Sequence, residues 1–303
     1  MTTTPSSRTR SVMWTGQMTA QSSIAHGGEH KGTVTTIRRE RILRDGEPIY
    51  VPILSGNGIR GRLRRTAEEL YRETVGYEGQ IDVGAAHVLR SGGSLVKRAS
   101  TTALTGSRLR TARELVPPLA IFGGVVGRSI EGALQVGKAV PHLAETAHLT
   151  GHPGPSMFSV LQLETYTRAP RAGAPALEAL DTTSMPMTSA GDVDRDALLE
   201  LNAADPRDDL DGQMVFRVET LPAGTVLSTW MRLAHVTDLH LAFFVDVLAA
   251  FTAHARIGGR AALGHGLVDA ALTPDTDLAD LPDWRAPLRD RHDEVMAALA
   301  LLG

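Results

Sequence analysis

The sequence lacks cysteine altogether, although it runs to 303 residues. This absence excludes a disulfide framework, a thiolate metal site and a cysteine nucleophile. Aromatic residues make up only 4% of the chain, and no apolar run approaches the roughly 18 residues of a membrane-spanning helix. The polar stretch Met1–Arg10 also lacks the apolar core of a signal peptide. With a mean hydropathy of -0.07, the composition predicts a soluble globular protein that resides in the cytoplasm and has no membrane partner.

Each half of the chain is poor in charge of one sign. Residues 1–130 contain 19 Lys and Arg against 10 Asp and Glu, a net charge of +9, whereas residues 131–303 contain 12 against 24, a net charge of -12. A basic half indicates a polyanionic partner such as nucleic acid. Opposite charges in one chain also favour head-to-tail association between copies. Two merely solvated faces explain the same counts, so the alternatives stay open at this point.

The periodicity of apolar residues predicts an α+β protein. Its chain order is β-α-β-β-α-β, the order of a ferredoxin-like or RRM-like antiparallel sheet with helices on one face and the other face open. We expect a single domain over residues 1–303, with insertions at about 77–130 and 168–212 and an acidic C-terminal tail over 274–303. The expected strands are Ser11–Gln21, Ala133–Val140, Ser159–Arg168, Met214–Leu221, Thr225–Ala234 and Leu267–Leu272.

Turn and cap signals place the connections between these elements. Asp45-Gly46 predicts a turn, and Pro222-Ala-Gly224 predicts a hairpin between its flanking strands. Ser22–Gly32 is expected to be a loop. Thr237 is expected to cap a buried helix over Asp238–Ala255.

The stretch Ile49–Tyr71 is the most informative part of the chain. An apolar strand is followed by a glycine turn and then by a helix whose first turns carry four arginines, Arg60, Arg62, Arg64 and Arg65. Cations at a helix N-terminus oppose the macrodipole. Free N–H groups there attract phosphate, so the pattern predicts a bound anion. We expect Arg60 and Arg62 to face phosphate, and Arg64 to share that face or to meet the acidic half of a neighbouring subunit.

Two other motifs match those of different protein classes, but each match is incomplete. Gly56-Asn-Gly-Ile-Arg-Gly61 matches the dinucleotide fingerprint G-x-G-x-x-G, but no acidic residue ends an apolar strand at the distance that this fold requires. His26-Gly-Gly-Glu-His30 matches an inverted zinc-protease motif. That motif needs a helix, which two central glycines disfavour by about 1 kcal/mol each. No cofactor and no metal are therefore expected.

Basic, glycine-rich junctions recur near residues 27, 58 and 258. In the expected fold all three lie along one side. Glycines there let the protein backbone approach an anion, and the cations neutralise the charge of that anion. Phe122-Gly-Gly124 with Arg128 is a fourth candidate, although a core strand ending in a turn explains this stretch better when it is taken alone. Met185 and Met187 lie in the long segment 168–212 and could insert between bases, or simply pack.

Three of these motifs resemble those of the RAMP superfamily of CRISPR proteins. Leu54–Arg65 is similar to the signature turn and first helix of that superfamily, Gly258–Gly266 to its glycine-rich loop, and Ile121–Gly124 to a turn of backbone subunits. Within the superfamily the chain most resembles a backbone subunit of a class 1 effector complex, with type IV the closest likeness. The resemblance implies an RRM-like palm, a helical finger or web region at 77–130 and a thumb at 168–212.

The resemblance also implies a non-catalytic protein that polymerises along a guide RNA and binds its phosphates. The implied partners are guide RNA, further copies of the chain, other effector subunits and, through guide pairing, target nucleic acid. Type III subunits that cut RNA carry an aspartate in the hairpin before the signature strand, and Gly32–Arg39 has none. The expected RNA contacts, from the resemblance and from the basic junctions together, are Ser22, Ser23, His26, Lys31, Ser55, Asn57, Arg60, Arg62, Arg65, Arg128, Arg256, Gly258, Gly259 and Arg260.

Two enzymatic alternatives remain open from the sequence. One is a guide-processing ribonuclease of the same superfamily, with His26 or His265 as the general base. The other is a dinucleotide-binding enzyme built on Gly56–Gly61.

Overall fold

The computed structural model describes residues 9–93, 103–168 and 214–303. The chain forms two compact units. The first comprises Met1–Gly28, Ile37–Gln162 and Thr220–Gly303, and the second comprises Glu29–Thr36 and Leu163–Glu219. The predicted thumb at 168–212, with Met185 and Met187, lies almost wholly outside the described residues. Among the described helices, none has the length and apolar character needed to cross a bilayer.

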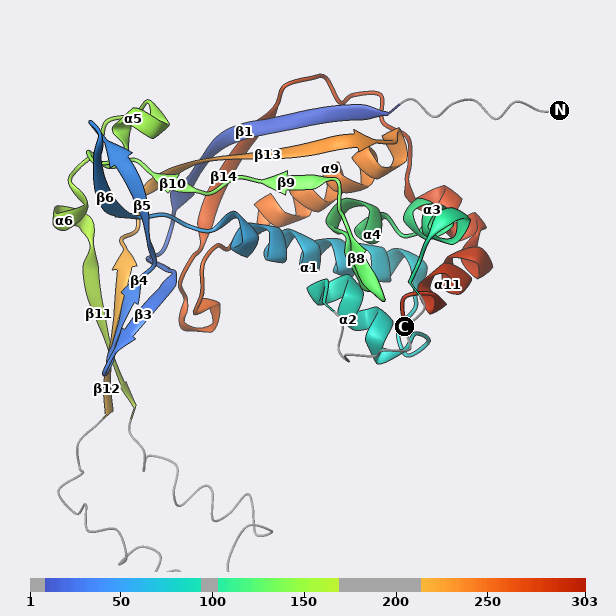
Figure 1. The fold of residues 1–303 in the computed structure, drawn as a ribbon, viewed down its shortest axis with the longest axis horizontal. Coiled ribbons are helices and arrows are strands. Elements are labelled where there is room, and N and C mark those ends of the chain that lie inside the picture. Colours follow the sequence, from blue (N-terminus) through green and yellow to red (C-terminus); the bar gives the residue numbers. More distant parts are fainter. Residues whose placement is uncertain (1–8, 94–102, 169–213) are drawn as a thin grey trace, which may run out of the picture. The chain divides into compact units, whose positions relative to one another are not determined.

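An antiparallel sheet forms the centre of the first unit (Figure 1). Its long central strand is β1 (Arg10–Ala20), which pairs on one side with β14 (Val268–Pro274) and on the other with β13 (Val226–Val236). The outer edge of β13 pairs with two short strands, β9 (Leu134–Val136) and β10 (Val140–Pro141). The strand order is therefore β9 and β10, β13, β1, β14, and the mixed α+β class predicted from the sequence is confirmed.

Two long helices cover one face of this sheet (Figure 1). They are α1 (Gly56–Val75) and α9 (Asp238–Ala253), and Thr237 caps α9 as predicted. The strands alternate in burial, so Trp14 of β1 is 2% exposed and packs edge-on against Phe244 of α9, with 5.3 Å between ring centroids. This alternation places the hydrophobic core between sheet and helices.

Smaller elements surround α1. They are α2 (Val83–Ser91), α3 (Gly106–Leu115), α4 (Pro117–Phe122), hairpin β7 (Gly124–Val126) and β8 (Arg128–Ile130), α10 (Arg285–Asp290) and α11 (His292–Ala300). The apolar run before Gly123 is a helix and not a strand, because Pro117 occupies its first position, where proline is favoured. The acidic C-terminal segment packs into the same core, since Trp284 is 1% exposed and lies edge-on to Phe243.

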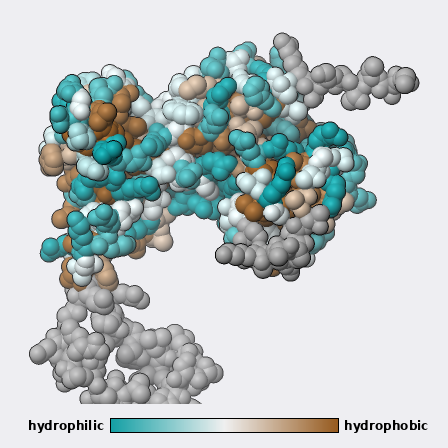
Figure 2. Space-filling view, in the orientation of Figure 1, coloured by the Kyte–Doolittle hydropathy of each residue, from teal (hydrophilic) through white to brown (hydrophobic). Residues whose placement is uncertain are grey.

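A two-stranded hairpin precedes α1. Strands β5 (Arg39–Arg44) and β6 (Glu47–Pro52) are joined at Asp45-Gly46, whose φ angles of 52° and 86° confirm the predicted turn. One hairpin face packs beside α5 (Ala147–Thr150) and α6 (Met157–Val160) over a small core that includes Val51 and Met157. Figure 2 shows hydrophobic side chains on the outer surface of this region, where Leu43 is 63% exposed.

A second sheet has the order β11, β12, β4, β3. Its strands are β3 (Gly27–Lys31), β4 (Val34–Ile37), β11 (Gln162–Arg168) and β12 (Met214–Leu221), and β12 runs parallel to β4. The predicted loop at 22–32 is wrong, because it contains β3 and the short strand β2 (Ile24–Ala25). At Pro222–Gly224 the predicted turn forms, with the N–H of Thr225 donating to the carbonyl of Pro222 at 3.3 Å. The predicted hairpin does not form, because the last residues of β12 pair with β2 while β13 enters the first sheet.

Arg64 anchors α1 to its neighbours through a buried guanidinium. Its side chain is 6% exposed and donates hydrogen bonds to the carbonyls of Val88 at 3.1 Å, Gly123 at 3.0 Å and Phe122. These carbonyls lie at the C-terminal ends of α2 and α4, where a cation is favourable. Burial, together with repulsion from Arg60, lowers the pKa of Arg64 to about 10. The expectation that Arg64 faces phosphate or a neighbouring subunit is therefore wrong.

We predict that Arg64→Ala lowers the free energy of unfolding by about 3 kcal/mol, because three buried carbonyls lose a charged donor. Arg64→Lys should lose less, since an ammonium keeps the charge but not the planar fork. Arg62→Ala is the matched control and should change stability by no more than about 0.5 kcal/mol. Urea denaturation of the three variants measures these differences. Equal losses for Arg62→Ala and Arg64→Ala would contradict the anchoring role.

Candidate nucleic-acid interface

The three glycine-rich junctions meet in the first unit. The N–H of Gly259 donates to the carbonyl of Ala25 at 2.7 Å, and the N–H of Gly266 donates to that of Ser23 at 2.9 Å. The N–H of Ser55, at the start of α1, donates to Nε2 of His26 at 3.3 Å. The loop after β1, the loop before β14 and the first turn of α1 are thus joined directly, as the sequence predicted.

Glycine is required at two positions of the loop before β14, one that faces Ala25 and one that faces another residue of the same loop. Gly258 has a φ of 75°, and a Cβ there would lie 2.4 Å from the carbonyl oxygen of Ala25. Gly266 has a φ of 79°, and a Cβ there would lie 2.0 Å from the carbonyl oxygen of Ile257. The close packing of the backbone is therefore sufficient to explain the glycines of this loop. Arg260 itself is exposed and has a left-handed φ of 56°.

The serines predicted to contact RNA hold these loops together. Oγ of Ser22 accepts a hydrogen bond from the N–H of Leu267 at 3.0 Å. Oγ of Ser23 lies 2.9 Å from Nδ1 of His265, whose side chain is only 2% exposed. Sequence patterns do not indicate this pairing, because the partners are 242 residues apart.

The helix α1 begins at Gly56, so the glycines predicted to form a turn lie inside its first two turns. Ser55 is the N-cap, and its Oγ accepts from the N–H of Asn57 at 3.2 Å. A Cβ at Gly56 would lie 2.3 Å from the carbonyl oxygen of Val136, so glycine is required there. Gly58 and Gly61 meet nothing within 4 Å. The first turn contains no acidic residue, and its bare backbone is open to an anion.

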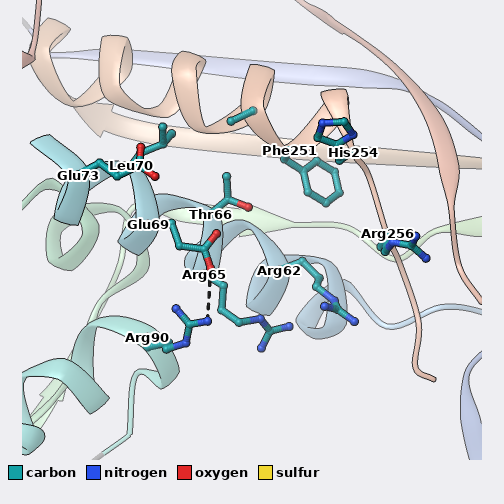
Figure 3. Close-up of a pocket in the computed structure, with 11 residues that line it drawn as sticks. Arg62, Arg65, Thr66, Glu69, Leu70, Glu73, Arg90, Phe251, His254 and Arg256 are labelled. Atoms are coloured by element: carbon teal, nitrogen blue, oxygen red, sulfur yellow. Dashed lines mark hydrogen bonds and ion pairs between the residues drawn. The ribbon is translucent and has the colours of Figure 1, made fainter. Parts of the chain in front are cut away.

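The four arginines of α1 divide into two pairs. Arg60 and Arg64 turn inwards, and the guanidinium of Arg60 donates to the carbonyl of Phe122 at 2.6 Å and lies 5.9 Å from its ring centroid. Burial lowers the pKa of Arg60. Arg62 and Arg65 lie on another side of the helix, where they line a surface groove (Figure 3).

The groove has a volume of about 460 Å³ and runs between α1 and α9. Figure 3 shows Arg62 and Arg256 toward one end, near the ring of Phe251, which is 4% exposed, and Arg65 in the middle, between Arg62 and Arg90. Burial, and repulsion from Arg62 and Arg90, lower the pKa of Arg65. Such crowding of like charges favours an anion in the groove. The lining residues are Arg62, Arg65, Thr66, Glu69, Leu70, Glu73, Arg90, Ala250, Phe251, His254 and Arg256.

The other end of the groove is acidic. Glu69 and Glu73 line it, and Arg90 is held by Glu68 at 2.6 Å and by Glu69 at 3.3 Å. Phosphate is therefore favoured only at the end that Arg256 shares. Arg90 and His254 were not among the predicted contacts, because nothing in the sequence around them indicates that they meet α1.

The remaining predicted contacts lie elsewhere. Lys31 belongs to the second unit, is exposed and lies 3.9 Å from Glu29. Arg128 is exposed on the β7–β8 hairpin, which packs beside α2. Their contacts with RNA remain predictions.

The enzymatic alternatives find little support in this geometry. The strand before α1 pairs only with β5 in an antiparallel hairpin in the described part of the chain, whereas a dinucleotide fold needs a parallel sheet there. His265 is buried against Ser23. Nε2 of His26 accepts a hydrogen bond from the N–H of Ser55, so this nitrogen is already engaged in the fold. Among the residues described, no three His, Cys, Asp or Glu side chains are grouped to hold a metal.

Comparison with known proteins places this geometry in a family. The sequence model of the RAMP superfamily matches residues 17–269. The chain belongs to the RAMP superfamily. It is similar to a chain in a solved structure entitled Type IV-B CRISPR Complex, with 32% identity, a TM-score of 0.62 and coverage of 90% of this chain and 96% of that chain. The RAMP resemblance and the likeness to type IV are thereby confirmed. No curated protein matches the chain.

His26 generates a prediction about pH, because its ring must be neutral to accept from Ser55. Burial, and then repulsion from Arg38, lower the pKa of His26 below its usual value of 6.5. The unfolded chain therefore takes up this proton more readily, and the stabilisation present above pH 6.5 is lost as the pH falls through the folded-state pKa. His26→Gln keeps an acceptor but cannot titrate. Between about pH 7.5 and 5.5, the melting temperature of the wild type should fall further than that of His26→Gln. Identical losses would rule out this role, since the other histidines are common to both proteins.

Proposed function

We propose that this RAMP protein is a non-catalytic backbone subunit of a CRISPR effector complex and that it binds the phosphates of a guide RNA. The observation that carries the proposal is the groove that Arg62, Arg65 and Arg256 line beside the open first turns of α1. Family membership and the similarity to a chain of a Type IV-B CRISPR complex support it.

The finer fold assignment rests on topology. Strand order β9 and β10, β13, β1, β14, with α1 and α9 on one face, is the arrangement expected of a ferredoxin-like sandwich. We assign this sheet as the palm and the elements between Gly76 and Ile130 as the finger or web region. The thumb at 168–212 remains a proposal from the sequence.

Guide binding would be independent of sequence. Guanidinium groups and helix N–H groups recognise phosphate and not base edges. The guide bases would then stay free to pair with target nucleic acid. The groove binds phosphate at its Arg256 end only, so the guide crosses the start of α1 and does not follow its whole length.

Assembly into a filament is supported by charge. Residues 1–130 carry a net charge of +9 and residues 131–303 a net charge of -12. Head-to-tail contact between copies would set these charges against each other. Other effector subunits would join the same particle, as subunits do in the complex that provides the structural match.

We predict that Arg62→Ala weakens binding of single-stranded RNA and reduces by about 1 the slope of log affinity against log salt concentration, because one phosphate contact is lost. RNAs of different sequence should be affected alike. Arg289→Ala, which removes an exposed arginine of α10, is the control and should leave the slope unchanged. Filter binding at four salt concentrations measures both. A slope that Arg62→Ala does not alter would contradict the proposal.

A second prediction concerns the bare backbone of α1. Gly58→Ala should raise the free energy of unfolding by up to about 1 kcal/mol, because alanine favours a helix and the site is open. The added methyl group should nevertheless weaken RNA binding, since it keeps phosphate away from the helix. Thermal unfolding and RNA titration of one preparation test both parts. If the variant is stabilised and binds as well as the wild type, phosphate does not approach this turn.

A further inference from the structure

The face of the first sheet opposite α1 and α9 carries an exposed aromatic side chain. Along β13, Leu227, Met231 and Leu233 are fully buried beneath the helices. Side chains alternate across a strand, so Trp230 and Arg232 lie on the other face. Trp230 is 40% exposed, whereas the two other tryptophans, Trp14 and Trp284, are 2% and 1% exposed.

The indole of Trp230 is held in place from one side. The residue on the neighbouring chain segment is Gly137, where an added Cβ would lie 2.5 Å from Nε1 and 2.7 Å from Cδ1 and Cε2 of the indole. The ring therefore lies directly against a backbone that has no side chain. The N–H of Gly137 also donates to the carbonyl of Trp230 at 2.8 Å. This contact restricts the movement of the ring on one side and leaves the rest of it exposed to a ligand.

A second pair of rings lies next to Trp230 on this face. His142 and His152 stack with 4.5 Å between centroids and an interplanar angle of 23°. Nε2 of His142 lies 2.8 Å from Oγ of Ser228, the residue two before Trp230 on β13. Nε2 of His152 lies 3.3 Å from Nε2 of Gln17, which is paired with Ser228 across the sheet. The rings are thus tied to two adjacent strands, at Ser228 and Gln17, and Ser228 lies about 7 Å along β13 from Trp230.

The surroundings of these rings are polar and mostly uncharged. Thr15 lies opposite Trp230 on β1, and Thr273 lies opposite Thr15 on β14. Arg232 supplies a positive charge two residues beyond Trp230, with Gln135 opposite it on β9. One arginine is too little for a phosphate track. One exposed large apolar side chain is equally too little for the apolar centre of a protein interface.

We propose that this surface, the Trp230 face, binds unpaired bases of a single-stranded nucleic acid by stacking. Bases offer flat rings to Trp230 and to the histidine pair, and hydrogen-bonding edges to threonine and glutamine. Arg232 complements the charge of an adjoining phosphate. The face lies across the sheet from the α1 groove, so this inference does not depend on guide binding there. An unpaired RNA segment and a displaced DNA strand share the required chemistry.

Tryptophan fluorescence of the nuclease-treated, full-length protein tests the proposal. A 12-residue oligouridylate and the matching oligothymidylate distinguish RNA from DNA, and duplex RNA of equal length is the control. We expect at least one single strand to quench the accessible part of the emission, which belongs to Trp230, while duplex RNA does not. Emission from the buried Trp14 and Trp284 should persist at saturation. Emission that no single strand changes, or that duplex RNA quenches equally, would overturn the proposal.

Two variants separate stacking from structure. Trp230→Ala should weaken binding of the quenching oligonucleotide by about 5- to 100-fold, and Trp230→Phe should restore most of the affinity because a ring remains. Neither should alter the salt slope. The double variant Arg62→Ala, Arg65→Ala should reduce the salt slope of RNA binding at the α1 groove yet still show quenching at saturation, which distinguishes failure of the guide site from failure of the Trp230 face. Wild-type affinity in a folded Trp230→Ala protein would refute the inference.

Discussion

The buried guanidinium of Arg64 dictates how the helices of the first unit meet. Among the described residues no carboxylate pairs with it, so its charge is stabilised by carbonyls at the C-terminal ends of α2 and α4. Three helices must therefore converge at one point. Arg60, one turn earlier on α1, donates to the same Phe122 carbonyl, and its guanidinium lies over the same ring. Once these two arginines are fixed inwards, helical periodicity turns Arg62 and Arg65 to a different side, and the groove acquires its charge.

That groove has the features of a site kept for function at some cost in stability. Guanidinium groups that repel one another would be avoided in a merely structural helix start, where acidic residues are preferred. Burial of Arg65 and repulsion from Arg62 and Arg90 lower its pKa, although Glu69 partly offsets this effect. A bound phosphate would offset both the burial of the Arg65 charge and its repulsion by the other arginines. The groove is therefore a stronger candidate site for the guide than the glycine loop. The loop glycines are already explained by the close approach of Ala25 and Ile257.

The sequence was sufficient where local chemistry decides the structure. The cap at Thr237, the Asp45-Gly46 turn and the periodic helix after Ser55 were predicted because each depends on neighbours within a few residues. It failed where a distant partner decides. The direction of Arg64 depends on carbonyls 24 to 59 residues away. The local sequence at Pro222–Gly224 is typical of a hairpin. The end of β12 nevertheless pairs with β2, and β13 pairs with β1 in the other sheet. The convergence of three junctions was predicted, because it follows from the chain order of the fold.

The groove and the Trp230 face lie on opposite sides of one sheet, and this separation constrains how nucleic acid can use them. A helix layer packs about 10 Å from a sheet, so one nucleotide cannot touch both surfaces. The groove offers charge and should act through salt-sensitive phosphate contacts, whereas the Trp230 face offers rings and should be nearly indifferent to salt. A guide held by phosphates exposes its bases for pairing and has no need of a stacking platform at the same place. The Trp230 face therefore serves a segment that is not paired, either a different part of the guide or another strand.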